Sequence, residues 1–161
     1  MSYTNIIGAD ELLAKVESLL PAVENAVKMC GLHVEKEAKR LCPVDDGTLR
    51  NSIQASEVES WYGDRGFTYR CTVGTNVEYA PYVHQGTGIY AKEGDGRDTR
   101  WSYQDAEGVW HSTLGQKPNP FLKRALRTGE GKGELRKRVQ ESVHDALKYG
   151  YYQNEIDWDA D

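Results

Sequence analysis

Apolar residues recur at steps of three and four over residues 10–41, which is the spacing of one face of an α-helix. Asp10 suits the N-cap position, and charged residues occupy the opposite side from residue 23 onward. Pro21 divides the pattern, so we expect a break or kink there. Pro43 ends it, because the residue before a proline is disfavoured in the helical conformation.

The segment "CPVDDGTLRNSI", residues 42–53, is typical of a turn that leads into a short helix. Gly47 can adopt the positive φ that other residues resist. We expect Thr48 to cap a short helical turn that carries Leu49 and Ile53 inward. Pro43 and Gly47 are therefore predicted structural turns.

Two β-hairpins follow from the pattern. Residues 53–61 and 67–73 are predicted as strands joined by the loop "YGDRG", and polar and apolar positions alternate in "FTYRCTV" as in a sheet with one solvated face. Within residues 89–116, two short runs of aromatic and apolar residues flank a turn-like "QDAEG". We expect a second hairpin there, projecting from the domain.

The last helical region opens at "KPNPFLKRAL", residues 117–126, with Pro120 in its first turn. We expect "TGEGKG" to interrupt the helix before it resumes with apolar residues on one face up to residue 148. Residues 149–161 show neither the helical nor the strand periodicity of apolar residues. We predict that they form an acidic and aromatic arm. The elements together predict one α+β domain over residues 1–148, a small, mostly antiparallel sheet flanked by the long N-terminal helix and the C-terminal helix.

Composition agrees with one soluble domain. The chain has 161 residues, 39% hydrophobic and 28% charged, with a mean hydropathy of −0.70. It shows neither a basic start before an apolar run nor a stretch near the roughly 18 apolar residues that span a bilayer, so we expect a cytosolic location and no membrane. Cys30, Cys42 and Cys71 lack metal-ligand spacing, which favours buried free thiols over a disulfide.

The segment "EYAPYVHQGTG", residues 78–88, places two tyrosines beside a histidine and admits a catalytic or a structural interpretation. We favour the structural one. Residues 79–83 are expected to form a short helical turn with its tyrosines packed over the sheet, and His84 to cap or edge it. Gly86 and Gly88 then turn the chain sharply into the second hairpin.

Catalytic and metal-binding patterns find little support. The four histidines belong to different predicted elements, and no Gly-x-Ser-x-Gly elbow occurs. "EGDGRDT" lacks the repeated acids of a calcium loop, and "GEGKG" lacks the Ser or Thr of a phosphate loop. We expect no enzyme, catalytic residue, cofactor or metal. The alternative hypothesis is an enzyme that acts on nucleic acid or cell wall. It predicts substrate turnover that depends on a metal ion or on His84.

Charge is unevenly distributed. Residues 117–138 carry eight bases and two acids, a net +6, which leaves −11 elsewhere in a chain of net charge −5. Such a basic stretch contacts phosphate, meets an acidic surface of another chain or is simply solvated. The predicted arm supplies an acidic surface, with Glu155, Asp157, Asp159 and Asp161.

Ten tyrosines and four tryptophans against two phenylalanines favour rings with a polar edge, which suit interfaces. Many lie around the second predicted hairpin. The candidate subunit-interface residues are Tyr79, Tyr82, Trp101, Tyr103, Trp110, Arg124, Arg127, Arg136, Arg138 and Trp158.

Three segments in order, "CPVDDGTLRNSI", "VGTNVEYAPYVHQGTG" and "KPNPFLKRAL", resemble the head–tail joining proteins of tailed bacteriophages, also called neck, tail-component or tail-completion proteins. The resemblance spans residues 10–148. Asp46 stands where that family usually has Thr. The predicted hairpin at 89–116 and the arm vary in length among such proteins, so no role is carried over to them.

The resemblance implies a structural protein of the virion neck or tail that assembles in the host cytoplasm. It implies a homo-oligomeric ring, for which we expect a hexamer, between a portal-side connector or head-completion protein and tail-terminator or tail-tube proteins. Non-specific contact with genome DNA in the channel is an expected consequence. The alternative is a DNA-binding packaging or morphogenesis factor that uses the basic stretch at 117–138.

Overall fold

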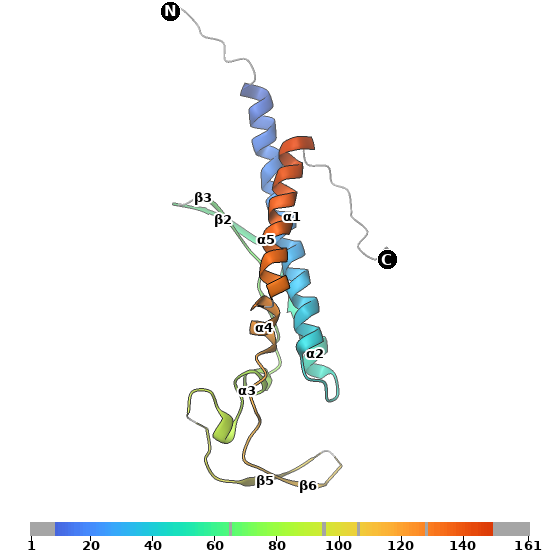
Figure 1. Ribbon diagram of the computed structural model, residues 1–161, viewed down its shortest axis with the longest axis vertical. Helices are drawn as coiled ribbons and strands as arrows, with labels where there is room; N and C mark the ends of the chain where they lie inside the picture. The colour runs from blue at the N-terminus through green and yellow to red at the C-terminus, as the bar shows by residue number, and fades with distance from the viewer. Residues whose placement is uncertain (1–8, 65, 95, 106, 128, 150–161) are drawn as a thin grey trace, which may run out of the picture. The chain divides into compact units, whose positions relative to one another are not determined.

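The structure, a computed structural model, describes residues 9–149 except positions 65, 95, 106 and 128 (Figure 1). Contacts divide the chain into two compact units. The first unit comprises the residues through Cys30, the segment Glu57–Cys71 and the residues from Gly133 onward, and the second comprises Gly31–Ser56 and Thr72–Lys132. The α+β class is confirmed. A single domain over residues 1–148 stays a prediction.

Helix α1, Ala9–Leu41, runs through Pro21 without a break in its helical assignment. Of the predicted break or kink, the break is therefore wrong, and the kink stays a prediction. Pro21 removes one backbone N–H and its hydrogen bond, but the alanines that follow at positions 22 and 26 are almost fully buried, and their packing favours a continued helix. The predicted end before Pro43 is confirmed.

Helix α5, Gly129–Tyr149, contributes its residues from Gly133 onward to the first unit, where they lie beside α1 (Figure 1). The Ser18 hydroxyl donates to the Ala146 carbonyl at 3.5 Å, and the Cys30 thiol donates to the Leu135 carbonyl at 3.7 Å. The earlier residue of α1, Ser18, contacts the later residue of α5, Ala146, and the later residue of α1, Cys30, contacts the earlier one, Leu135. The two helices are therefore antiparallel. Among the residues of this unit whose burial the structure describes, the buried ones are all small: Ala22, Ala26 and Ala146.

The predicted strands at 53–61 and 67–73 are divided between the units. In the first unit β2, Glu59–Gly63, pairs with β3, Gly66–Arg70, as an antiparallel hairpin. In the second unit β1, Gln54–Ala55, pairs with β4, Val73–Gly74. With the later hairpin, the described part of the chain has three two-stranded sheets in place of the one small sheet expected from the sequence.

The second unit holds the larger core. Its short helices are α2, Thr48–Ser52; α3, Ala80–Gln85; the 3₁₀ turn η1, Gly88–Tyr90; and α4, Phe121–Arg127. Strands β5, Trp101–Gln104, and β6, Trp110–Thr113, form the predicted second hairpin. The buried side chains are Val34, Ala38, Cys42, Leu49, Ile53, Ala80, Phe121 and Ala125.

The start of α2 differs from the prediction. Thr48 is the first helical residue and not the cap. Gly47 precedes it at φ 85°, and the Asp46 carboxylate accepts hydrogen bonds from the Thr48 amide and from the Thr48 hydroxyl, each at 2.8 Å. Asp46 therefore satisfies a free helical N–H, as a capping side chain does. Leu49 and Ile53 are buried as expected.

The interruption at "TGEGKG" is shorter than predicted, because α5 already begins at Gly129. Residues 150–161 of the predicted arm, Trp158 included, lie outside the described residues. None of the three cysteines, all of which lie in the described part of the chain, forms a disulfide; Cys42 is buried, whereas Cys30 and Cys71 are half-buried.

Candidate subunit interface

The first two motif segments meet in the second unit. Strand β1, which directly follows the first segment, pairs with β4 of the second, and the Ser52 and Thr75 hydroxyls lie 2.5 Å apart. The third segment joins them: the Asn119 amide donates to the Val83 carbonyl at 2.9 Å, and the rings of His84 and Phe121 meet edge to face at 5.8 Å between centroids. We call this arrangement the motif junction. Segments far apart in sequence thus share one core.

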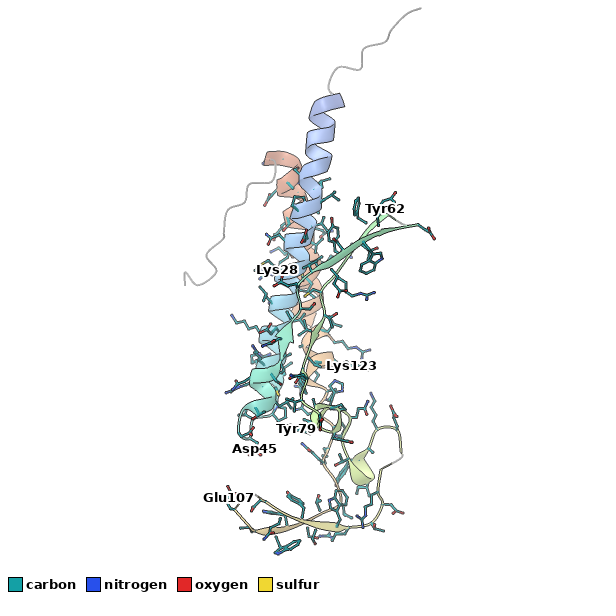
Figure 2. The ribbon with its side chains drawn as sticks, turned by 180° about the vertical axis from the view of Figure 1, so that it is seen from behind. Lys28, Asp45, Tyr62, Tyr79, Glu107 and Lys123 are labelled. Carbon is teal, nitrogen blue, oxygen red and sulfur yellow. The ribbon has the colours of Figure 1, made fainter. Side chains whose placement is uncertain are left out.

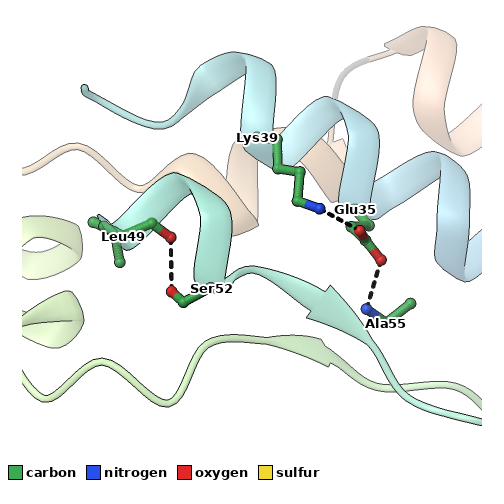
Figure 3. Close-up of polar contacts among 5 residues, drawn as sticks. All are labelled: Glu35, Lys39, Leu49, Ser52 and Ala55. Atoms are coloured by element: carbon green, nitrogen blue, oxygen red, sulfur yellow. Dashed lines mark hydrogen bonds and ion pairs between the residues drawn. The ribbon is translucent and has the colours of Figure 1, made fainter. Parts of the chain in front are cut away.

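Glu35 ties α1 to the motif junction (Figure 3). Its carboxylate accepts a hydrogen bond from Lys39 Nζ at 2.5 Å and another from the Ala55 amide at 2.7 Å. Burial raises the pKa of Glu35, but the hydrogen bonds from Lys39 and Ala55 and the Lys39 charge together outweigh burial and lower the pKa below its usual range. The charged carboxylate therefore stabilises the folded unit.

Backbones cross closely where the chain enters and leaves the second hairpin. The Thr87 amide donates to the Gln116 carbonyl at 2.9 Å, and the Ile89 amide to the Leu114 carbonyl at 3.0 Å. A Cβ on Gly88 would lie 2.0 Å from the Leu114 oxygen, and one on Gly115 would lie 2.0 Å from the Thr87 oxygen. Only glycine fits such a crossing. Gly86 and Gly88, the predicted turn residues, have positive φ values of 83° and 60°.

His84 lies half-buried on α3 against Phe121. Burial lowers its pKa, and the charges of Lys92 and Lys123 lower it further. Its described contacts are those of a packed ring. Within the described residues, no group of three His, Cys, Asp or Glu side chains is placed to hold a metal ion.

The two tyrosines of the corner lie outward. Tyr79 and Tyr82 have exposed fractions of 44% and 63%, so the prediction that they pack over the sheet is wrong. Ala80 is the buried residue of α3, because a short helix buries only one side and the small residue takes the close approach. The exposed rings remain available for contact with another chain.

The other predicted interface residues divide between the units. In the second unit, Tyr103 and Trp110 are exposed on the β5–β6 hairpin, Trp101 is half-buried, and Arg124 and Arg127 are exposed on α4. In the first unit, Arg136 is exposed and Arg138 half-buried on α5. Of the predicted aromatics, Tyr82 and Trp101 come together at one cavity.

The β5–β6 hairpin has an ordered tip. The Asp105 carboxylate bonds His111 Nε2 at 2.6 Å and accepts the Val109 amide at 2.7 Å, and these two hydrogen bonds lower the pKa of Asp105. The Tyr103 ring stacks on His111 with centroids 5.3 Å apart. The hairpin therefore presents its exposed rings on a defined backbone.

Sequence reasoning missed one aromatic surface. Every residue of β2 is exposed, and Trp61, Tyr62 and Phe67 have exposed fractions of 40%, 74% and 55% (Figure 2). Tyr62 and Phe67 are cross-strand partners in edge-to-face contact at 5.1 Å, and Arg70 lies over the Trp61 ring at 4.8 Å. The signal was the cluster of aromatic residues on both sides of one tight turn.

Part of the chain resembles a known protein family. Residues 10–86 match the family model described as "Bacteriophage HK97-gp10, putative tail-component". Over this range the chain is similar to the phage tail-component family. The match to this tail-component family includes the first motif and the second up to Gly86, and it ends before the β5–β6 hairpin and the third motif.

Among curated proteins and solved structures, none matches the chain. In the part of the chain that is described, no helix has both the length and the apolar character that crossing a bilayer requires.

Proposed function

We propose that the protein joins head and tail in a tailed-phage virion, as a ring of copies in the neck or at the top of the tail. The match of residues 10–86 to a phage tail-component family carries this proposal. The exposed rings support it, since exposed aromatic clusters on a soluble protein are typical of interaction sites. We infer a hexamer with a portal-side connector on one side and tail-terminator or tail-tube proteins on the other.

The proposal assigns the protein a structural and not an enzymatic role. Its test is the mass of the purified full-length chain by light scattering, with negative-stain images of the protein alone and with isolated tails. We expect closed rings that seat on tail ends. In lysates of a phage that lacks the gene, we expect separate heads and tails, restored to whole virions by the wild-type gene. A monomer that leaves tails bare, or whole virions without the gene, overturns the proposal.

Matched variants sharpen this test. Tyr82→Ser with Trp110→Ser removes two exposed rings of the second unit. Tyr62→Ser with Phe67→Ser removes two from the first. We expect at least one pair to leave the chain folded and monomeric, because interface energy is concentrated in a few aromatic anchors.

A second candidate function is binding to DNA through the basic stretch. Like charges are close around α4: the charges of Arg127, on the same helix, and of Lys92, from the segment before β5, lower the pKa of Lys123. Such a cluster attracts phosphate. A filter-binding titration of duplex DNA tests it. We expect the affinity to fall steeply as the salt concentration rises. Arg124→Gln with Arg127→Gln should reduce the slope of log affinity against log salt concentration by about two. If the wild-type protein and this double variant retain equal amounts of DNA on the filter at every salt concentration, this function is excluded.

A further inference from the structure

A cavity of about 350 Å³ lies in the second unit beside the segment that leads from α3 to β5. Its lining includes the backbones of Gly86 and Gly88, the rings of Tyr82 and Trp101, and the cationic side chains of Lys92 and Arg97. This volume is at the lower end of the range of about 300–1,000 Å³ found for sites that bind small ligands. It suits one aromatic side chain and not a folded surface.

Part of the wall is rigid backbone. A Cβ on Gly96 would lie 2.0 Å from the Gly88 oxygen and 2.6 Å from the Ala91 Cβ, so these two turns touch directly. The Lys92 amide also donates to the Gln85 carbonyl at 3.2 Å, which holds the returning segment against α3. The cavity is therefore bounded by closely packed backbone at Gly88 and Gly96 and by two rings.

The cavity lining carries a net positive charge. It includes two cations, Lys92 and Arg97, and one acid, Glu93. The Arg97 guanidinium lies 5.8 Å from the centre of the Trp101 ring, and its Nε donates to Thr99. The Lys92 charge also lowers the pKa of Lys123 and of His84, so positive potential extends to α4. A ligand with an aromatic group between negative charges fits this chemistry.

The chain itself contains such a segment. Residues 151–161, "YYQNEIDWDAD", carry four acids and no base, with Trp158 between Asp157 and Asp159. We propose that the cavity binds the acidic segment 155–161 of a second copy, with the Trp158 indole as its anchor. The inference rests on the proposed ring. In a cyclic assembly each copy offers two different faces, and the cavity and this segment are two such faces.

The test uses a full-length Trp158→Ala chain as acceptor, so that its own segment lacks the anchor. A fluorescein-labelled peptide of residues 150–161 is titrated in and its anisotropy recorded. We expect saturable binding that weakens with salt. The same peptide with Trp158→Ala should bind about thirtyfold more weakly, because a buried aromatic anchor contributes on the order of 2 kcal/mol. This peptide comparison needs no change in the protein.

Charge variants of the acceptor locate the site. Lys92→Gln with Arg97→Gln should weaken binding about tenfold, whereas Arg136→Gln with Lys137→Gln, the same charge change on α5, should leave it unchanged. A thermal melt of each variant checks its fold. Peptide binding lost only in the α5 variant, or a peptide that never saturates, overturns the inference. So does duplex DNA that displaces the peptide and depends on the same two residues.

The outcome is separable from the proposed function. The mass of the wild-type chain reports whether rings form, independently of the peptide. Rings without peptide binding overturn this inference alone, and a wild-type chain that stays monomeric overturns the ring.

Discussion

The motif junction and the β2–β3 hairpin use apolar residues in opposite ways. In the motif junction Ile53 and Phe121 are fully buried, and glycines allow backbones to touch. In the hairpin all five residues of β2 are exposed, the rings of Trp61 and Tyr62 among them, and Figure 2 shows Tyr62 on the β2–β3 hairpin. Burial of apolar surface lowers the free energy, so a residue buried within the fold stabilises the fold itself. An exposed ring is buried, and contributes in this way, only when the protein associates with another chain. Stability and association are thus encoded in different segments.

The largest expected effect on stability is at the centre of the motif junction. Phe121→Ala should reduce the free energy of unfolding by about 3–5 kcal/mol, because it deletes a fully buried ring and leaves a cavity. Urea titration followed by circular dichroism measures it. Phe67→Ala is the matched control, since Phe67 is the only other phenylalanine in the chain and is more than half exposed. An equal loss for both would abolish the comparison.

The backbone crossing should be nearly as sensitive. Gly88→Ala combines a positive φ of 60° with a Cβ 2.0 Å from the Leu114 oxygen, and we expect a loss of roughly 2–4 kcal/mol. Gly94→Ala separates the two causes, because Gly94 has φ 74° but open space around it. It should cost about 1 kcal/mol. Thermal unfolding of the Gly88→Ala and Gly94→Ala variants provides the measurement. Similar unfolding midpoints would mean that the positive φ alone, and not the steric clash at Gly88, causes the loss of stability.

Glu35 should have a smaller effect that depends on pH. Glu35→Ala leaves the Ala55 amide without its carboxylate partner and should cost about 1–2 kcal/mol near neutral pH. Because the folded pKa lies below the ordinary value of 4.5, the stabilisation is fully present above that pH and is lost as pH falls through the folded pKa.

The pH dependence is measured by comparing wild type and Glu35→Gln. The difference in their unfolding free energies should be larger at about pH 7 than at about pH 3. A difference that grows with acidification contradicts the assigned role of the carboxylate.

The smallest effect on stability should come from the hairpin. Tyr62→Ser with Phe67→Ser removes an exposed ring pair and should change the unfolding free energy by no more than about 1.5 kcal/mol. Its effect should appear in assembly, as a lower mass by light scattering and poorer seating on tails. A variant that unfolds at room temperature would show that the hairpin belongs to the core.

Local features were predictable from the sequence because they depend on neighbouring residues alone. The step of three and four residues gave helix α1, and the aromatic runs around "QDAEG" gave the β5–β6 hairpin. Gly47, Gly86 and Gly88 were identified because turns need positive φ. Local reasoning failed where packing outweighed a preference, as at Pro21, and where exposure was in question, as at Tyr82.

The sequence by itself determined the main helical regions, the hairpins, the turns and the similarity of residues 10–86 to phage tail components, because periodicity, turn chemistry and motif spacing are properties of short segments. Only the tertiary structure decided that the three motifs build one core, that Glu35 bonds the Ala55 amide and that Tyr82 and Trp101 line one cavity. These contacts join residues far apart in the chain, and the free energy of bringing such segments together depends on the whole packing and not on any local pattern.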